Sequence, residues 1–211
     1  MQNNNRYSKY IALVALLISI VGVTLGFAAY SNTVSIKARA DVSVVDPTKK
    51  PGVLSTSPTE QVDGSVTPTT ENGATAEVAT LTDDQIEGIM VHFTATGQSA
   101  TYTFNVYNPT EFTGYLKRVG FGTKQCTAST TSSNPATQGI ADACEDITMR
   151  IIIDDTDEYI DTEDSITGKS LASHGHKEVK VIVDYIENGR TADGDFDVNF
   201  GTSTINYSTV D

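Results

Sequence analysis

The sequence predicts an all-β protein, an antiparallel β-sandwich of Ig-like or jelly-roll type, preceded by one N-terminal hydrophobic helix. The sandwich is predicted because about seven or eight short stretches alternate apolar with polar residues and are joined by polar, turn-rich segments. The helix is predicted because the run from Tyr10 to Tyr30 is apolar, small or aromatic except at Ser19 and Thr24. Elsewhere, no window holds a helical period longer than about two turns.

The N-terminal run has the length of a membrane span. At about 1.5 Å per residue, Ile11 to Ala29 makes a helix of roughly 28 Å, close to the thickness of the bilayer's hydrocarbon core. Arg6 and Lys9 precede the run and no acid does, which by the positive-inside tendency leaves residues 1–9 in the cytoplasm. Residues 31–211 are then extracellular, at the cell membrane or secreted.

The end of the run leaves two outcomes open, a cleaved signal peptide or a retained transmembrane helix. Ala28 and Ala29 are small residues of the kind that a signal peptidase accepts, which favours cleavage between Ala29 and Tyr30. Phe27 stands three residues before that cut, where a small residue is usual, and this favours retention. Cleavage frees the extracellular domain, whereas retention of residues 10–30 anchors it.

The first predicted strand follows at once, from Thr33 to Val45. Its apolar residues occupy every second position from Val34 to Val44, which is the pattern of a half-buried strand. Residues 46–76 then change character, with four prolines among Thr, Ser and Gly and few large apolar residues. This composition predicts a Pro/Thr/Ser-rich loop or linker rather than core.

Six later stretches carry strand patterns and are bounded by turn residues such as Asn108-Pro109 and Asn188-Gly189. The stretches are 89–93, 99–109, 111–121, 147–153, 179–185 and 196–200, and Ile205 and Tyr207 close the chain. The stretch 147–153 is apolar nearly throughout, which predicts a central strand. Residues 123–146 are polar, and we expect them to form an excursion that the two cysteines close at its base.

Charge and cysteines narrow the function classes. The net charge is −13, and the exported part is more acidic still because Arg6 and Lys9 stay behind, so we expect no nucleic-acid partner.

Cys126 and Cys144 are the only cysteines, both in the exported part, where a disulfide is stable. We expect that disulfide, worth about 3 kcal/mol in the chain-entropy model. The alternative is that the two cysteines are free thiols or metal ligands. The sequence has no further cysteine or nearby histidine to complete a set of four metal ligands.

Acidic clusters are the first candidates for chemistry. Residues 154–164 hold seven acids and no base, which suits Ca²⁺, but Ile160 stands where an EF-hand loop starting at Asp155 needs glycine. A D-x-D-x-D spacing recurs at Asp193, Asp195 and Asp197. These acids alternate with Phe196 and Val198, which predicts the solvent face of a strand rather than a metal site. We therefore predict no metal or cofactor.

Histidines and nucleophile motifs give little support for an enzyme. His174 and His176 supply two ligands for Zn²⁺ or Cu²⁺, but the sequence indicates no third ligand, and a surface loop is the simpler interpretation. His92, inside a strand pattern, is typical of a packed or edge residue. A hydrolase needs His92 or His174 beside a serine and an acid, and no G-x-S-x-G, S-x-x-K or H-E-x-x-H pattern occurs. We predict that the protein is not an enzyme.

Three features together resemble the TasA/camelysin-type exported proteins of Gram-positive bacteria. They are the leader end Phe27-Ala28-Ala29-Tyr30, the alternating strand Val34 to Val44 and the later segment GQSATYTFNVYNP. The resemblance implies a specialised signal peptidase, a jelly-roll sandwich and, for matrix-fibre members, polymerisation when the freed N-terminal strand adds to a neighbouring subunit. It makes Ala29 the last leader residue and Thr33 to Val45 the donor strand. The cysteine pair, residues 46–76 and the acidic run depart from the fibre-subunit pattern.

The sequence thus predicts an exported, non-enzymatic cell-surface or biofilm-matrix structural protein that self-associates through strand edges, with N-terminal strand donation as the route. The alternative is a membrane-anchored ectodomain, held by residues 10–30, that binds a carbohydrate, cation or protein ligand through its loops. Backbone hydrogen bonds serve a strand equally well within one molecule or between two. The pattern of residues does not decide between these functions.

Overall fold

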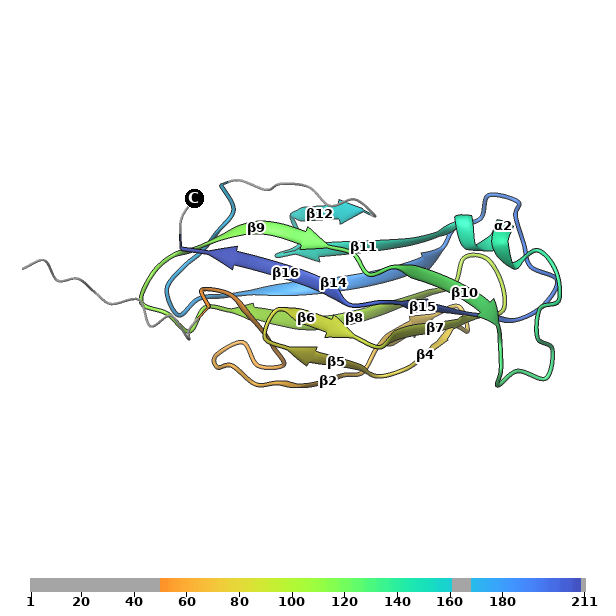
Figure 1. The fold of residues 1–211 in the computed structure, drawn as a ribbon, viewed down its shortest axis with the longest axis horizontal. Coiled ribbons are helices and arrows are strands. Elements are labelled where there is room, and N and C mark those ends of the chain that lie inside the picture. Colours follow the sequence, from red (N-terminus) through yellow and green to blue (C-terminus); the bar gives the residue numbers. More distant parts are fainter. Residues whose placement is uncertain (1–49, 161–167, 210–211) are drawn as a thin grey trace, which may run out of the picture. The chain divides into compact units, whose positions relative to one another are not determined.

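The computed structural model of the chain describes residues 50–160 and 168–209. The predicted hydrophobic helix, its cleavage point and the first predicted strand all precede residue 50 and lie outside the described residues. The described part is built of antiparallel strands in packed sheets, as Figure 1 shows, so the all-β sandwich prediction is confirmed at this level. In the described part, no helix is long and apolar enough to cross a membrane.

One sheet has six strands, and β8 and β14 pair along almost their whole length at its centre. Its strands are β1 (Val53–Ser55), β3 (Thr69–Glu71), β8 (Ser99–Tyr107), β11 (Ile147–Ile153), β12 (Asp157–Ile160) and β14 (His176–Tyr185). β1 and β3 pair with opposite ends of the same side of β8. β11 has β14 on one side and β12 on the other, so the predicted interior position of residues 147–153 is confirmed.

The facing layer is formed by two sheets whose strands continue into one another, since β9 leads into β10, β6 into β7 and β15 into β16. The six-stranded part holds β2 (Gly64–Val66), β5 (Ala79–Thr82), β6 (Gln85–Glu87), β9 (Gly114–Gly120), β13 (Ser170–Leu171) and β16 (Ser203–Ser208). The four-stranded part holds β4 (Thr75–Ala76), β7 (Ile89–Phe93), β10 (Lys124–Ala128) and β15 (Phe196–Phe200). The short helix α2 (Ile140–Glu145) lies in the segment that the cysteines bracket.

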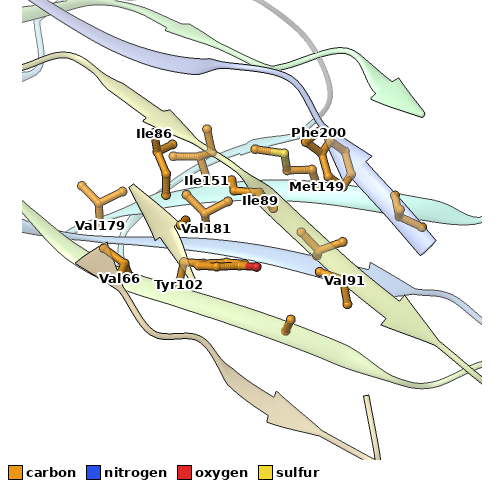
Figure 2. Close-up of a cluster of buried hydrophobic side chains, with 14 of the residues drawn as sticks. Val66, Ile86, Ile89, Val91, Tyr102, Met149, Ile151, Val179, Val181 and Phe200 are labelled. Carbon is orange, nitrogen blue, oxygen red and sulfur yellow. The ribbon is translucent and has the colours of Figure 1, made fainter. Parts of the chain in front are cut away.

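The core lies between the layers and is filled by every second residue of the long strands. Tyr102, Ile151 and Val181 of the first sheet and Ile89 and Val91 of the facing layer belong to one buried cluster (Figure 2). Burial of one such aliphatic side chain is worth about 1.5–3 kcal/mol. The alternation that predicted these strands is therefore the alternation that builds the core.

Residues 50–76 require a correction, because the sequence predicted loop or linker here. This stretch carries β1, β2, β3 and β4, and Val53, Leu54 and Val66 are buried. The prediction was wrong for the described part of the segment because strands of two or three residues are too short to show a period-2 pattern among prolines and threonines. The Pro-rich segment is part of the folded domain.

The chain enters the sandwich through two buried residues, Pro51 and Gly52. A Cβ atom on Gly52 would lie 2.5 Å from Cδ2 of Tyr207 in β16, and one on Gly114 in β9 would lie 2.6 Å from the Pro51 carbonyl oxygen. Both positions therefore need glycine because the incoming backbone passes against two strands. The next residues form β1, which pairs with the Tyr107 end of β8.

Candidate functional site

A hollow of about 480 Å³ lies at the opposite end of β8, beside Ser99. We call it the Thr148 groove, and define it by Glu71, Thr148, Arg150, Ile160, Ile186 and Glu187, which line it together with the Gly97–Ser99 turn and Asp184–Tyr185. The alternation of β11 directs Thr148 and Arg150 away from the core, because Met149 and Ile151 between and beside them are buried. The groove has the size of ordinary ligand sites.

Arg150 is fixed in the groove by two carboxylates. Its guanidinium donates to Asp184 Oδ2 at 2.8 Å and to Glu158 Oε1 at 2.9 Å. The hydrogen bond to Glu158, reinforced by Asp184, raises the pKa of Arg150 above its ordinary value. The positive charge of Arg150 is thus matched within the protein.

The turn that forms one wall is held by the buried side chain of Gln98. Its Oε1 accepts from the backbone N–H groups of Thr94 and Ala95, and its Nε2 donates to the carbonyl of Asn72 and to Thr94 Oγ1. The Gly97 N–H donates to the Tyr185 carbonyl at 2.8 Å. The wall is therefore pre-organised by hydrogen bonds, each worth about 1 kcal/mol.

A smaller hollow of about 230 Å³ lies against the other side of Tyr185. Thr94, Thr96 and Thr191 contribute hydroxyl groups to it, and its floor includes Phe196. Tyr185 and Phe196 pack edge to face with ring centroids 5.4 Å apart. Tyr185 thus separates two hollows at the loop end of the sandwich.

The segment between the cysteines is fastened at its base and along its length. The Sγ atoms of Cys126 and Cys144 lie at disulfide distance, 1.94 Å apart, as the predicted bridge requires. The segment also pairs with the strand that leads into β15, since the N–H groups of Ser129 and Ala136 both donate to the Asp195 carbonyl. The bridge and the backbone bonds hold the same loop.

The three alternating aspartates also bind this loop, and the prediction of a solvent-facing row is corrected for Asp197, whereas Asp193 is exposed as predicted. Asp193 accepts from the Thr137 and Gln138 N–H groups, Asp195 from the Ser132 hydroxyl, and Asp197 from the Thr130 N–H at 3.4 Å. Asp197 is buried. The prediction failed because alternation identifies the face that turns away from the core, but not a loop that covers that face.

The described acids of the acidic run each pair with a basic side chain, a lysine for the three aspartates and Arg150 for Glu158. Asp154 pairs with Lys177 at 3.0 Å, Asp155 with Lys180 at 2.7 Å, and Asp157 with Lys169. Residues 161–164 of the run lie outside the described residues. Among the described residues, no group of three or more His, Cys, Asp or Glu side chains is arranged to hold a metal ion.

The histidines lie apart and have individual partners. His92 Nδ1 lies 2.7 Å from Asp197 Oδ1 on the outer side of β7, and its Nε2 lies 3.8 Å from Glu77. His174 Nε2 contacts Glu111 Oε1 at 3.0 Å, with Tyr107 Oη 3.5 Å from its Nδ1. His176 is exposed at the start of β14. The two histidines of the His-Gly-His sequence therefore have different surroundings.

Sequence reasoning missed the residues of the Thr148 groove. Thr148 and Arg150 interrupt the otherwise apolar stretch 147–153, and this was the one available signal that the strand has an outward face. Ile160 and Ile186 gave no signal, because an exposed isoleucine is indistinguishable from a core residue in sequence.

Comparisons with protein-family models, with curated proteins and with solved structures found no match.

Proposed function

We propose that this chain is an exported, non-enzymatic structural protein of the bacterial cell surface or biofilm matrix, with a sandwich of the jelly-roll type that the TasA/camelysin resemblance implies. The observation that supports it best is where the chain leaves the described fold. Pro51 and Gly52 are buried beside β9 and β16, and the next residues form β1, which among the described strands pairs only with β8. The predicted donor strand Thr33 to Val45 therefore precedes a strand at the edge of a sheet.

Reach and pattern support assembly by this strand. From Val45 to Lys50, before the buried Pro51, the chain spans five peptide units, up to about 18 Å when extended. That length lets Thr33 to Val45 pair with a sheet edge of a second copy while β1 stays in its own sheet. The alternating apolar face supplies side-chain contacts, and the backbone supplies the hydrogen bonds of strand addition.

The test is the intact mass and N-terminal sequence of the protein from membranes and from culture fluid, followed by electron microscopy of the released material. A chain that begins at Tyr30 outside the cell, and filaments whose length grows with protein concentration, are the expected results. Retention of Tyr10 to Ala29 in all of the protein rules out the secreted-fibre function.

A second function, a membrane-anchored ectodomain that binds a ligand through its loops, is favoured by a separate observation. Both hollows lie at the Ser99 end of β8, whereas the chain enters at the Tyr107 end. Nine residues of extended strand separate these ends by about 30 Å. The hollows therefore lie far from the residues at which the chain enters the described fold.

A further inference from the structure

The Thr148 groove is lined by large apolar side chains that remain exposed to solvent. Val78, Ile160 and Ile186 are the large hydrophobic residues that stay exposed in the described part, at 52%, 47% and 42%. Two of these three line this one groove. Single exposed apolar residues are ordinary, whereas a pair in one hollow of ligand size marks a surface that gains from being covered.

The floor of the groove holds a hydroxyl group without a partner. Thr148 Oγ1 is buried and has no hydrogen-bond partner among the described residues. A buried polar atom of this kind is costly to the fold, and the great majority find a partner. Because the atom has almost no accessible surface, it makes no direct contact with a ligand in the groove.

The charge of the groove is negative. Glu71, Asp184 and Glu187 line it against a single cation, Arg150, which is already matched by Asp184 and Glu158. Glu71 and Glu187 form no ion pair within the described residues. The groove therefore offers two aliphatic side chains and two carboxylates that no described side chain pairs with.

We propose that the Thr148 groove binds a peptide segment that carries both aliphatic and basic side chains. Aliphatic groups of the peptide cover Ile160 and Ile186, and its ammonium or guanidinium groups lie against Glu71 and Glu187. The complementary charge also selects against acidic segments, which matters for a chain of net charge −13 because copies of its own acidic surface are repelled.

This proposal rests on the ligand-binding function and specifies the ligand as a peptide. It does not depend on whether the chain is cleaved at Ala29.

The test uses the full chain in mild detergent and a fluorescein-labelled hexapeptide of alternating isoleucine and lysine. Binding is followed by fluorescence anisotropy at low ionic strength. The matched probe replaces each lysine with glutamate. We expect saturable binding of the lysine peptide, weakened by added salt, and no saturable binding of the glutamate peptide.

Two variants locate the site. Ile186→Ser should lower the affinity about tenfold, and Glu187→Lys about fivefold. Ile186 and Glu187 are exposed, so these changes should leave the unfolding midpoint near that of the unaltered chain. Glu60→Lys makes the same charge change as Glu187→Lys on a distant exposed residue and should leave the affinity unchanged.

Equal binding of the two peptides, or an equal loss in Glu60→Lys and Glu187→Lys, overturns the proposal, since either result means non-specific attraction. Absence of saturable binding of the lysine peptide also overturns the proposal. N-terminal sequencing and peptide binding are separate measurements, so the failure of one leaves the other interpretable.

Discussion

Tyr102 places one hydroxyl group in the middle of the core. Its ring is fully buried, and the hydroxyl donates to the Glu77 carbonyl at 3.0 Å, with the Met90 carbonyl at 3.3 Å. The hydroxyl thus connects β8 to β7 and to the chain beyond β4. Tyr102→Phe should lower the free energy of unfolding by about 1 kcal/mol, because it removes this donor and leaves the carbonyls to find other partners. Urea unfolding of the two proteins measures the difference.

The same residue predicts a loss of stability in alkali. Burial raises the pKa of Tyr102 to about 12, above its ordinary value near 10. The folded protein therefore holds this proton more tightly than the unfolded chain. The contribution of the protonated Tyr102 to the free energy of unfolding is complete below about pH 10 and is lost as the pH rises towards 12. Tyr102→Phe should lose less stability over that interval. An unchanged pH profile in the variant would contradict the assignment.

For Asp193 we expect stability to be lost at low pH rather than at high pH. The Thr137 hydroxyl and the Gln138 and Thr137 N–H groups donate to its carboxylate, and these bonds lower the pKa of Asp193. Because its pKa is lower in the folded protein, the ionised Asp193 contributes to the free energy of unfolding. This contribution is present above the pKa of the unfolded chain, near 3.9, and is lost as the pH falls through the lower pKa of the folded protein. We expect the protection factor of the Gln138 amide, its intrinsic exchange rate divided by its observed rate, to fall below that point. Asp193→Asn should show the lower protection factor already at pH 6, whereas Glu60→Gln should not.

At the scale of elements, the sequence predicted the strands that have a long alternating face. β7, β8, β14 and β15 were each located by apolar residues at every second position, because one face of each strand packs in the core. β1 to β4 were missed because pairing with β8, β5 and β7, rather than a pattern of their own, makes them strands. Tertiary pairing is not visible in a sequence window of two or three residues.

The groove and the loop contacts were beyond sequence reasoning for a related reason. Thr148 and Ile186 are distant in sequence and meet only because β11 and β14 are neighbours. Asp197 was predicted to face solvent because its alternation with Val198 is real, yet His92 and the disulfide-closed loop cover it. Periodicity gives the side of the strand, and the remaining contacts depend on which loop folds over that side.

The disulfide-closed loop gives a prediction at this scale. The bridge joins residues 18 apart, and its loss should lower the free energy of unfolding by about 3 kcal/mol. The double variant Cys126→Ser, Cys144→Ser should nevertheless fold with the loop in place, because Asp193, Asp195 and Asp197 bind it independently. Denaturant unfolding measures the stability, and amide exchange of Gln138 reports the loop. Rapid exchange there in the folded variant would show that the aspartates do not suffice.

At the scale of the whole molecule, the two ends of the described fold have different features. The chain enters beside β1 at one end, and the hollows and the disulfide-closed loop lie at the other. Attachment or assembly is proposed for the first end and ligand binding for the second. The two proposed functions differ in the fate of residues 10–30, since the secreted fibre needs cleavage at Ala29 and the anchored ectodomain needs retention.

The assembly function can be tested by placing a charge on one face of the predicted donor strand. Ile36 belongs to its apolar face and Ser35 to its polar face, and the two residues are adjacent. Strand addition buries the apolar face against the neighbouring copy, so Ile36→Lys should abolish filaments while Ser35→Lys, with the same added charge, should preserve them. Electron microscopy and sedimentation of the mature proteins give the readout. Filaments of normal length in Ile36→Lys would show that this strand is not the element that joins the copies, because a lysine in that interface is an unpaired buried charge.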